Sequence, residues 1–319
     1  MNILINTKLS EFYPNLAGPT IKSYTSNISK ALDLIDSTNL NDLYLKYNEI
    51  IKEVKKEYSE IGTQKCKYSS CVVYIKTLLT DEENETNNKI NEARKKYNEE
   101  IDIIKKKTIK ILAKFEKTEH EASGWVTDEE KLTIASHLLN KIPNEIKTLK
   151  DLILLRNYVV FKFYCDLASR CECSLSKFLY DNEFEDLNLL NTSYNYIILH
   201  KTEKTIRYIV NQHKNANRNG PYTVFLAETL YDLFDRYKKE LDKFKIIWFL
   251  PKDSGVENMS YTNLSQLYLS FGNIINKKIC IRVNRKIATS KVVNIADIQE
   301  ESRRQGHSFS QAIFTYSKK

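Results

Sequence analysis

The stretch YNYIILHKTEKTIRYIVNQHKNANRNGPYTVFL, residues 194–226, decides the fold class of this chain. It contains three short runs rich in Ile, Val, Tyr and Phe, at residues 194–199, 206–210 and 222–226. Polar segments separate the runs, at 200–204 and 213–220. Short β-branched and aromatic runs joined by polar turns predict three antiparallel strands connected by hairpins.

Most of the remaining sequence has the spacing of amphipathic helices. Apolar residues recur at steps of three and four, which places them on one face of a helix. Helices are expected near 19–35, 41–58, 65–79, 86–117, 128–140, 149–166, 227–244, 260–275, 283–291, 294–304 and 308–315. The predicted fold class is therefore mainly α with one small antiparallel β-sheet, an α+β architecture.

A break in the helical pattern marks a domain boundary near residue 122. His120–Gly124 interrupts the long helix, and Thr127 with Glu130 then fits a capping box that starts the next one. A chain of 319 residues corresponds to about two domains. We expect a helical domain over 1–122 and a second domain, which holds the sheet, over 123–319.

The charged helix expected over 86–117 has two interpretations. Its apolar positions fall on one face: Ile90, Ala93, Tyr97, Ile101, Ile104, Ile111 and Phe115. This face is typical of a helix packed on its own domain. It is also compatible with a coiled-coil arm for self-association. The spacing alone does not separate the two.

Positive charge is concentrated at the C-terminal end of the chain. The whole chain has 49 Lys and Arg against 41 Asp and Glu, a net charge of +8. Residues 276–319 hold ten Lys and Arg against three Asp and Glu, a surplus of seven positive charges. A basic segment on a nearly neutral body indicates a partner that carries phosphate groups.

Two other sequence features limit the class of protein. The six cysteines form no CxxC pair, and Cys171-Glu-Cys173 has the wrong spacing for a structural zinc site, so we expect free thiols in a reducing compartment. The start of the chain has the features of neither a signal nor a transit peptide. No apolar run approaches the ~18 residues of a membrane span, so we expect no membrane partner.

The residues that suggest chemistry lie near the C-terminal end. Arg282 and Arg285 are three positions apart. His307 follows Arg285 by 22 positions, in a Gly-His-Ser turn after a short amphipathic stretch, and Tyr316 follows His307 by nine. Two guanidinium groups can hold the oxygens of a phosphodiester, and a phenol is a nucleophile once it is activated.

This order and spacing resemble the catalytic domain of tyrosine recombinases, the integrases of phages and mobile elements. That family has an Arg, a hairpin Lys, a His-x-x-Arg pair, a Gly-His or Gly-Trp, and a nucleophilic Tyr. Arg170, at the end of an apolar helix, fits the first Arg, and Lys214, in the second hairpin, fits the Lys. The opening at Trp125 is similar to integrase-like genes of large DNA viruses. The resemblance covers about 125–319, whereas the first 120 residues fit the family's helical core-DNA-binding domain only in kind.

The chain departs from the family pattern at two places. Arg282 stands where the family has His; it can donate to a phosphate oxygen but cannot accept a proton. The stretch between Arg170 and Lys214 is longer than in many relatives. Lys201 and Lys204, in the first hairpin, are therefore alternatives to Lys214.

The resemblance implies a reaction on double-stranded DNA. Tyr316 would attack a phosphodiester to give a 3′-phosphotyrosyl link and a free 5′-hydroxyl. Arg170 and Arg285 would hold the phosphate oxygens, Lys214 would protonate the leaving oxygen, and His307 would hydrogen-bond the phosphoryl group. The covalent link keeps the bond energy, so neither ATP nor a metal cofactor is implied. Strand exchange in the family implies a homo-tetramer on two duplexes.

Three functions stay open at this point. The first is a site-specific recombinase or integrase. The second is a type IB-like DNA topoisomerase, which shares the same pocket. The third is a catalytically inactive DNA-binding protein of the same fold. Glu172, two residues after Arg170, is either a group that orients a neighbour or a plain surface acid.

Overall fold

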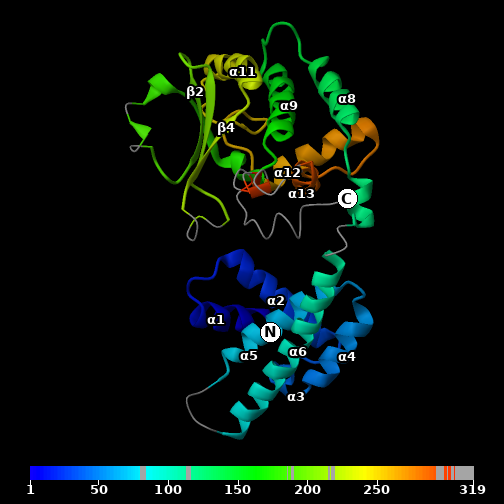
Figure 1. Ribbon diagram of the computed structural model, residues 1–319. Helices are drawn as coiled ribbons and strands as arrows, with labels where there is room; N and C mark the ends of the chain where they lie inside the picture. The colour runs from blue at the N-terminus through cyan, green and yellow to red at the C-terminus, as the bar shows by residue number, and fades with distance from the viewer. Residues whose placement is uncertain are drawn as a thin grey trace. The chain divides into compact units, whose positions relative to one another are not determined.

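The chain is mainly helical with one small four-stranded mixed sheet, in agreement with the predicted α+β class (Figure 1). The computed structural model describes residues 1–79, 84–112, 116–184, 186–187, 190–214, 216, 220–291, 298–299, 301–302 and 305. Two compact units divide the chain: a first unit, Met1–Lys114, and a second unit, Phe115–Lys319. Each unit has its own hydrophobic core.

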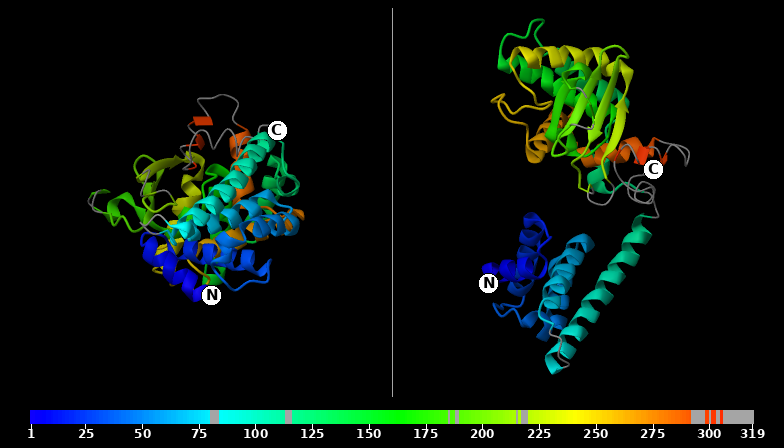
Figure 2. Two further views of the ribbon diagram at one scale, coloured as in Figure 1. Left: turned by 90° about the horizontal axis from the view of Figure 1, so that it is seen from below. Right: turned by 90° about the vertical axis from the view of Figure 1, so that its left-hand side faces the viewer.

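The first unit consists of helices. They are α1 (Asn2–Phe12), α2 (Gly18–Asp33), α3 (Asp42–Leu45), α4 (Tyr47–Glu57), α5 (Ile61–Lys76) and α6 (Glu85–Leu112). The helix α6 runs along α5 (Figure 2). The buried Tyr97 hydroxyl of α6 donates a 3.0 Å hydrogen bond to the Leu43 carbonyl of α3. The sequence missed α1, and the helix predicted over 41–58 is interrupted at Lys46.

The predicted apolar face of α6 packs within the first unit. Its buried positions are Ile90, Ala93, Tyr97, Ile101 and Ile104. Ile111, also predicted on this face, is 52% exposed, and Phe115 lies outside the described residues. The contacts of α6 therefore support the interpretation of a helix packed on its own domain, up to about Ile104.

The second unit begins before the boundary predicted near residue 122. Its first helix, α7 (Glu119–Ser123), contains that boundary. The Glu121 carboxylate of α7 forms a buried ion pair with Lys286 of a later helix, which ties α7 to the second unit. The predicted capping box is present at the next helix, where the Glu130 amide donates to the Thr127 hydroxyl and the Glu130 carboxylate accepts from the Thr127 amide.

The second unit places helices around the sheet. Its longer helices are α8 (Asp128–Leu139), α9 (Leu149–Asp166), α11 (Tyr231–Lys243), α12 (Tyr261–Phe271) and α13 (Ile281–Ser290). Short 3₁₀ turns connect some of them: η1 (Cys171–Leu175), η2 (Asp181–Glu183), η4 (Glu228–Leu230) and η5 (Gly272–Ile275). The helices predicted at 294–304 and 308–315 fall largely outside the described residues.

The sheet contains the three predicted strands and one more. It has the order β1 (Ser176–Tyr180), β2 (Asn195–His200), β3 (Thr205–Val210) and β4 (Tyr222–Leu226). The pairs β2–β3 and β3–β4 are antiparallel, as predicted, but β1 runs parallel to β2. The prediction of a purely antiparallel sheet was therefore wrong. A parallel neighbour needs a crossover, here residues 181–194, and so carries no hairpin signal in the sequence.

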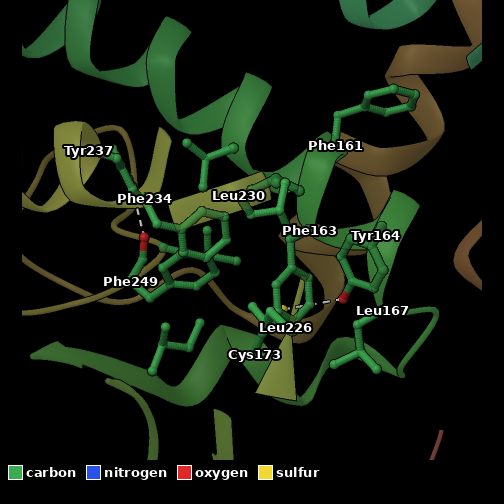
Figure 3. Close-up of a cluster of buried hydrophobic side chains, with 14 of the residues drawn as sticks. Phe161, Phe163, Tyr164, Leu167, Cys173, Leu226, Leu230, Phe234, Tyr237 and Phe249 are labelled. Atoms are coloured by element: carbon green, nitrogen blue, oxygen red, sulfur yellow. Dashed lines mark hydrogen bonds between the residues drawn. The ribbon is translucent and has the colours of Figure 1, made fainter. Parts of the chain in front are cut away.

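Aromatic side chains form the core between the sheet and the helices α9 and α11 (Figure 3). The ring of Phe249 lies 5.3 to 5.8 Å, between centroids, from those of Phe163, Phe178 and Phe234. The Tyr237 hydroxyl donates a 2.8 Å hydrogen bond to the Phe249 carbonyl. This packing fixes the C-terminal end of α9, from which the first candidate site residue follows.

Candidate active site

Arg170 lies directly after the C-terminal end of α9. The helix ends at Asp166, and the backbone at Arg170 is extended. The hydroxyls of Tyr164 and Ser169, both buried, donate hydrogen bonds of 2.9 and 3.0 Å to the Arg170 carbonyl. The core therefore fixes this backbone, while the Arg170 side chain keeps 17% of its surface exposed.

Arg285 lies on α13 and is 4% exposed. Its guanidinium Nη2 donates a 3.1 Å hydrogen bond to the Gln305 carbonyl, and the Gln305 side-chain amide donates back to the Arg285 carbonyl. The side-chain amide of the neighbouring Asn284 donates a 2.7 Å hydrogen bond to the backbone carbonyl of Tyr164. Tyr164 thus holds both arginine-bearing segments, Arg170 through its hydroxyl and α13 through its carbonyl.

Glu172 is a buried acid close to Arg170. Its carboxylate is 3.8 Å from Arg170, and 8% of its side chain is exposed. Burial raises the pKa of Glu172, while the positive charges of Arg170 and Arg285 oppose this rise. Burial also raises the pKa of Tyr222, and the positive charges of the same two arginines oppose that rise. Because Arg170 and Arg285 both act to lower the pKa of Glu172 and of Tyr222, both guanidinium groups lie in the neighbourhood of these two side chains.

Lys214 lies at the mouth of a cavity that also contains Arg170. The cavity has a volume of about 480 Å³ and is lined by Arg170, Glu172, Gln212, His213, Lys214 and Tyr261, among others. We call it the Arg170 cavity. Lys214 is exposed, and the ring of its neighbour His213 makes a 2.9 Å hydrogen bond with the Gly220 carbonyl across the β3–β4 turn.

The competing lysines of the first hairpin lie at the other end of β3. The β2–β3 turn holds Lys201 and Lys204, whereas Lys214 lies beyond the opposite end of β3. A strand of six residues spans about 20 Å. The Lys201 ammonium lies 3.8 Å from the centroid of the Tyr180 ring. Of these three lysines, the geometry therefore favours Lys214 as the partner of Arg170.

Arg282 lies one turn before Arg285 on α13, but its side chain is exposed. Neither Arg282 nor Arg285 is among the described residues that line the Arg170 cavity. His307 and Tyr316 lie outside the described residues.

One residue of the Arg170 cavity has no counterpart in the sequence prediction. Tyr261 begins α12 directly after the Ser260 cap, is 61% exposed, and lines the cavity beside Arg170. Only its position after a capping serine distinguishes it from the other tyrosines in the sequence, and that signal marks a helix start rather than a site.

The arrangement presents the guanidinium groups of Arg170 and Arg285 near a buried acid, Glu172, and the Lys214 ammonium at the same cavity as Arg170. Two guanidinium groups and an ammonium group can bind and neutralise a phosphate, since planar guanidinium groups match its oxygens in pairs. In the described part of the chain, no group of three or more His, Cys, Asp or Glu is placed to hold a metal ion. None of the described helices is both long enough and apolar enough to cross a bilayer. The six cysteines are free.

The chain matches no protein-family model, and a comparison with curated proteins also finds no match.

Proposed function

We propose that this chain is a tyrosine recombinase that breaks and rejoins double-stranded DNA at specific sites. The observation that carries the proposal is that Arg170 and Arg285, 115 positions apart in sequence, both act electrostatically on the buried Glu172, and that Arg170 and Lys214 line one cavity. Paired guanidinium groups are suited to a phosphodiester that gains charge during attack. The basic segment 276–319 adds further groups for the DNA backbone.

In the proposed reaction, the phenol oxygen of Tyr316 forms a bond to a backbone phosphorus while the bond from that phosphorus to the 5′ oxygen breaks. The phenol proton passes to water, and the Lys214 ammonium gives a proton to the departing 5′ oxygen. Arg170 and Arg285 hold the non-bridging oxygens, assisted by His307 and Arg282. A 5′-hydroxyl reverses these steps and restores the strand, so the cycle consumes no ATP.

The proposed assembly follows from the proposed reaction. Exchange between two duplexes requires four strands to be cut, and each cut uses one Tyr316. We therefore propose that four copies of the chain act on two duplexes. The first unit would supply further contacts to the DNA, as a helical core-DNA-binding domain.

The test is covalent trapping on a nicked duplex from which the short 5′-hydroxyl strand diffuses away after cleavage. The wild-type protein should form a covalent adduct, and mass spectrometry of the DNA-linked peptide should identify Tyr316. Tyr316→Phe should bind the duplex but form no adduct. Tyr261→Phe is the matched control, because it removes the hydroxyl of a tyrosine that lines the Arg170 cavity and should leave the adduct in place if Tyr316 is the nucleophile.

Three outcomes would contradict the proposal in different ways. An adduct on Tyr316→Phe would show that another residue is the nucleophile. Efficient relaxation of a supercoiled plasmid by a single duplex-bound protein, without a specific site, would instead support a type IB-like topoisomerase. Binding without any adduct on the wild-type protein would support an inactive DNA-binding protein.

A further inference from the structure

Asn195 is a fully buried amide at the start of β2, beside the Arg170 cavity. Its side-chain nitrogen donates hydrogen bonds of 2.9 Å to the Glu172 carbonyl and 3.0 Å to the Gln212 carbonyl. Its side-chain oxygen accepts a 2.7 Å hydrogen bond from the backbone N–H of Gln212. Both amide hydrogens and the amide oxygen are thus used, and all three bonds go to the backbone of other segments.

The two segments that Asn195 joins carry two of the proposed catalytic groups. Glu172 is two residues after Arg170, and Gln212 is two residues before Lys214. The strand β2 lies between the two segments in the sheet. Arg170 and Glu172 precede β1, on one side of β2, and Gln212 and Lys214 follow β3, on its other side. The first residue of β2 is therefore the position from which one side chain can reach both.

Neither segment has regular pairing where Asn195 holds it. Asn195 is paired with Ser176 of β1, so Glu172 lies before the parallel ladder begins. The β2–β3 ladder ends at Tyr196 and Ile209, so Gln212 lies beyond it. Without the side-chain amide of Asn195, the Glu172 carbonyl loses a buried hydrogen bond and the Gln212 backbone loses two partly buried ones, so the ends of both segments gain freedom.

We propose that Asn195 is a positioning residue that sets the distance between Arg170 and Lys214 across the cavity. This inference rests on the proposed function, because it assigns Asn195 a part in that reaction. Proton transfer from Lys214 to the leaving 5′ oxygen requires hydrogen-bond contact, and a displacement of about 1 Å can slow a positioned reaction about 100-fold. Loss of the amide should therefore act mainly on the protonation of the leaving oxygen.

A duplex with sulfur in place of the 5′ bridging oxygen isolates that step. A thiol ionises near pH 8.5, whereas water, the simplest hydroxyl, ionises near 15.7. A sulfur leaving group therefore departs without a proton donor, and cleavage of this duplex does not need Lys214. A defect in the position of Lys214 should disappear on the sulfur duplex, but a general loss of folding or of phosphate binding should persist.

The experiment measures single-turnover adduct formation by the full chain on the oxygen and sulfur versions of the nicked duplex. Asn195→Ala should be slowed about 100-fold on the oxygen duplex and should recover at least about tenfold on the sulfur duplex. Lys214→Ala should show the same recovery, and Arg170→Ala should show none. Asn211→Ala is the matched control, since the Asn211 side-chain amide donates to the Tyr194 carbonyl at the same end of the sheet and, among the described residues, joins neither Glu172 nor Gln212; it should stay near wild type on both duplexes.

A second variant covers the case in which Asn195→Ala does not fold. Asn195→Ser keeps a smaller hydrogen-bonding group and should give a milder defect with the same sulfur recovery. An equal defect on both duplexes, for either folded variant, would overturn the inference while leaving the proposed function intact. Absence of any adduct from the wild-type protein on both duplexes would overturn the proposed function and this inference with it.

Discussion

Both units of this chain bury charged and polar side chains, but the second unit buries more of them. In the first unit, α6 contributes a plain apolar face to the core, and ion pairs such as Lys55–Glu100 lie at the surface. In the second unit, charged and amide side chains are buried close to the Arg170 cavity, among them Glu172, Asn195 and Arg285. Buried charges and amides destabilise a fold unless they are paired, and sites that do chemistry gather them for that reason.

The difference concerns how many polar groups each unit buries, and in the second unit several of them lie close to a cavity. Apolar periodicity explains most helices of the first unit, although not α1 and not the buried Lys67, whose ammonium donates a 3.1 Å hydrogen bond to the Asn27 side chain. In the second unit, the Arg285–Gln305 bonds and the buried Glu172 add nothing that a hydrophobic core needs. The predictions below test this contrast, beginning with the largest expected effect.

The largest effect is expected at Arg285. Loss of one group that stabilises developing charge slows an enzyme about 10²–10³-fold, so Arg285→Ala should reduce the rate of adduct formation by this factor. Arg282→Ala, one turn earlier and exposed, should slow it less than about tenfold, because an exposed ion pair contributes little. The measurement is single-turnover trapping at saturating DNA.

A control separates chemistry from folding at this buried position. Arg285→Lys keeps a positive charge but cannot offer two parallel N–H groups to a phosphate, so it should fold and still cleave slowly. Equal losses for Arg282→Ala and Arg285→Ala would contradict the distinction between the exposed and the buried arginine. A change in DNA affinity alone, for both variants, would argue against an enzyme.

The sequence predicted some parts of this fold because their signals are local. The runs of β-branched and aromatic residues predicted the strands β2 to β4. The helix α9 has its predicted bounds because Thr148 caps a continuous apolar stretch. The strand β1 was missed because Ser176–Tyr180 is short and its parallel partner follows only after a crossover. Local patterns cannot indicate a partner that lies so far along the chain.

In the candidate site too, some residues could be predicted from the sequence and others could not. Arg170, Lys214 and Arg285 were predicted from a family resemblance in order and spacing. Arg170 and Lys214 line one cavity, and Arg170 and Arg285 both act on the pKa of Glu172, while the catalytic roles of the three residues stay predictions. Asn195 and Tyr261 were not predicted from the sequence. An amide that bonds to three backbone groups looks in sequence like any other asparagine at a strand end, since its role depends on which segments the fold brings beside it.

The next effect concerns stability and tests whether the two cores are independent. Both tryptophans, Trp125 and Trp248, lie in the second unit, so tryptophan fluorescence follows that unit alone. Phe249→Ala should destabilise it by about 3–5 kcal/mol and lower the denaturant midpoint of the fluorescence transition. Ile90→Ala, in the core of the first unit, should shift the far-UV circular dichroism transition and leave the fluorescence midpoint unchanged. A fluorescence shift with Ile90→Ala would mean that the two units unfold together.

The smallest effect is a pH dependence at Glu172. Burial raises its pKa, so the folded protein holds this proton more tightly than the unfolded chain does. The stabilisation is complete below the usual carboxyl pKa of about 4.3 and is lost as the pH rises through the higher value of the folded state. Glu172→Gln does not ionise. It should match wild type in acid and become the more stable protein as the pH rises towards 8, by less than the Phe249→Ala effect.

Glu130 supplies a control of opposite sign in the same unit. Its pKa is lowered, chiefly by the hydrogen bond from Lys277, so its contribution to stability is present above the usual carboxyl pKa and lost in acid. Glu130→Gln should therefore equal wild type in acid and be the less stable protein near pH 8, as followed by the fluorescence midpoint. If Glu172→Gln behaved like Glu130→Gln, attraction to Arg170 and Arg285 would outweigh the burial of Glu172. The carboxylate would then be an ordinary stabilising ion-pair partner, and the contrast between the two units would lose one of its supports.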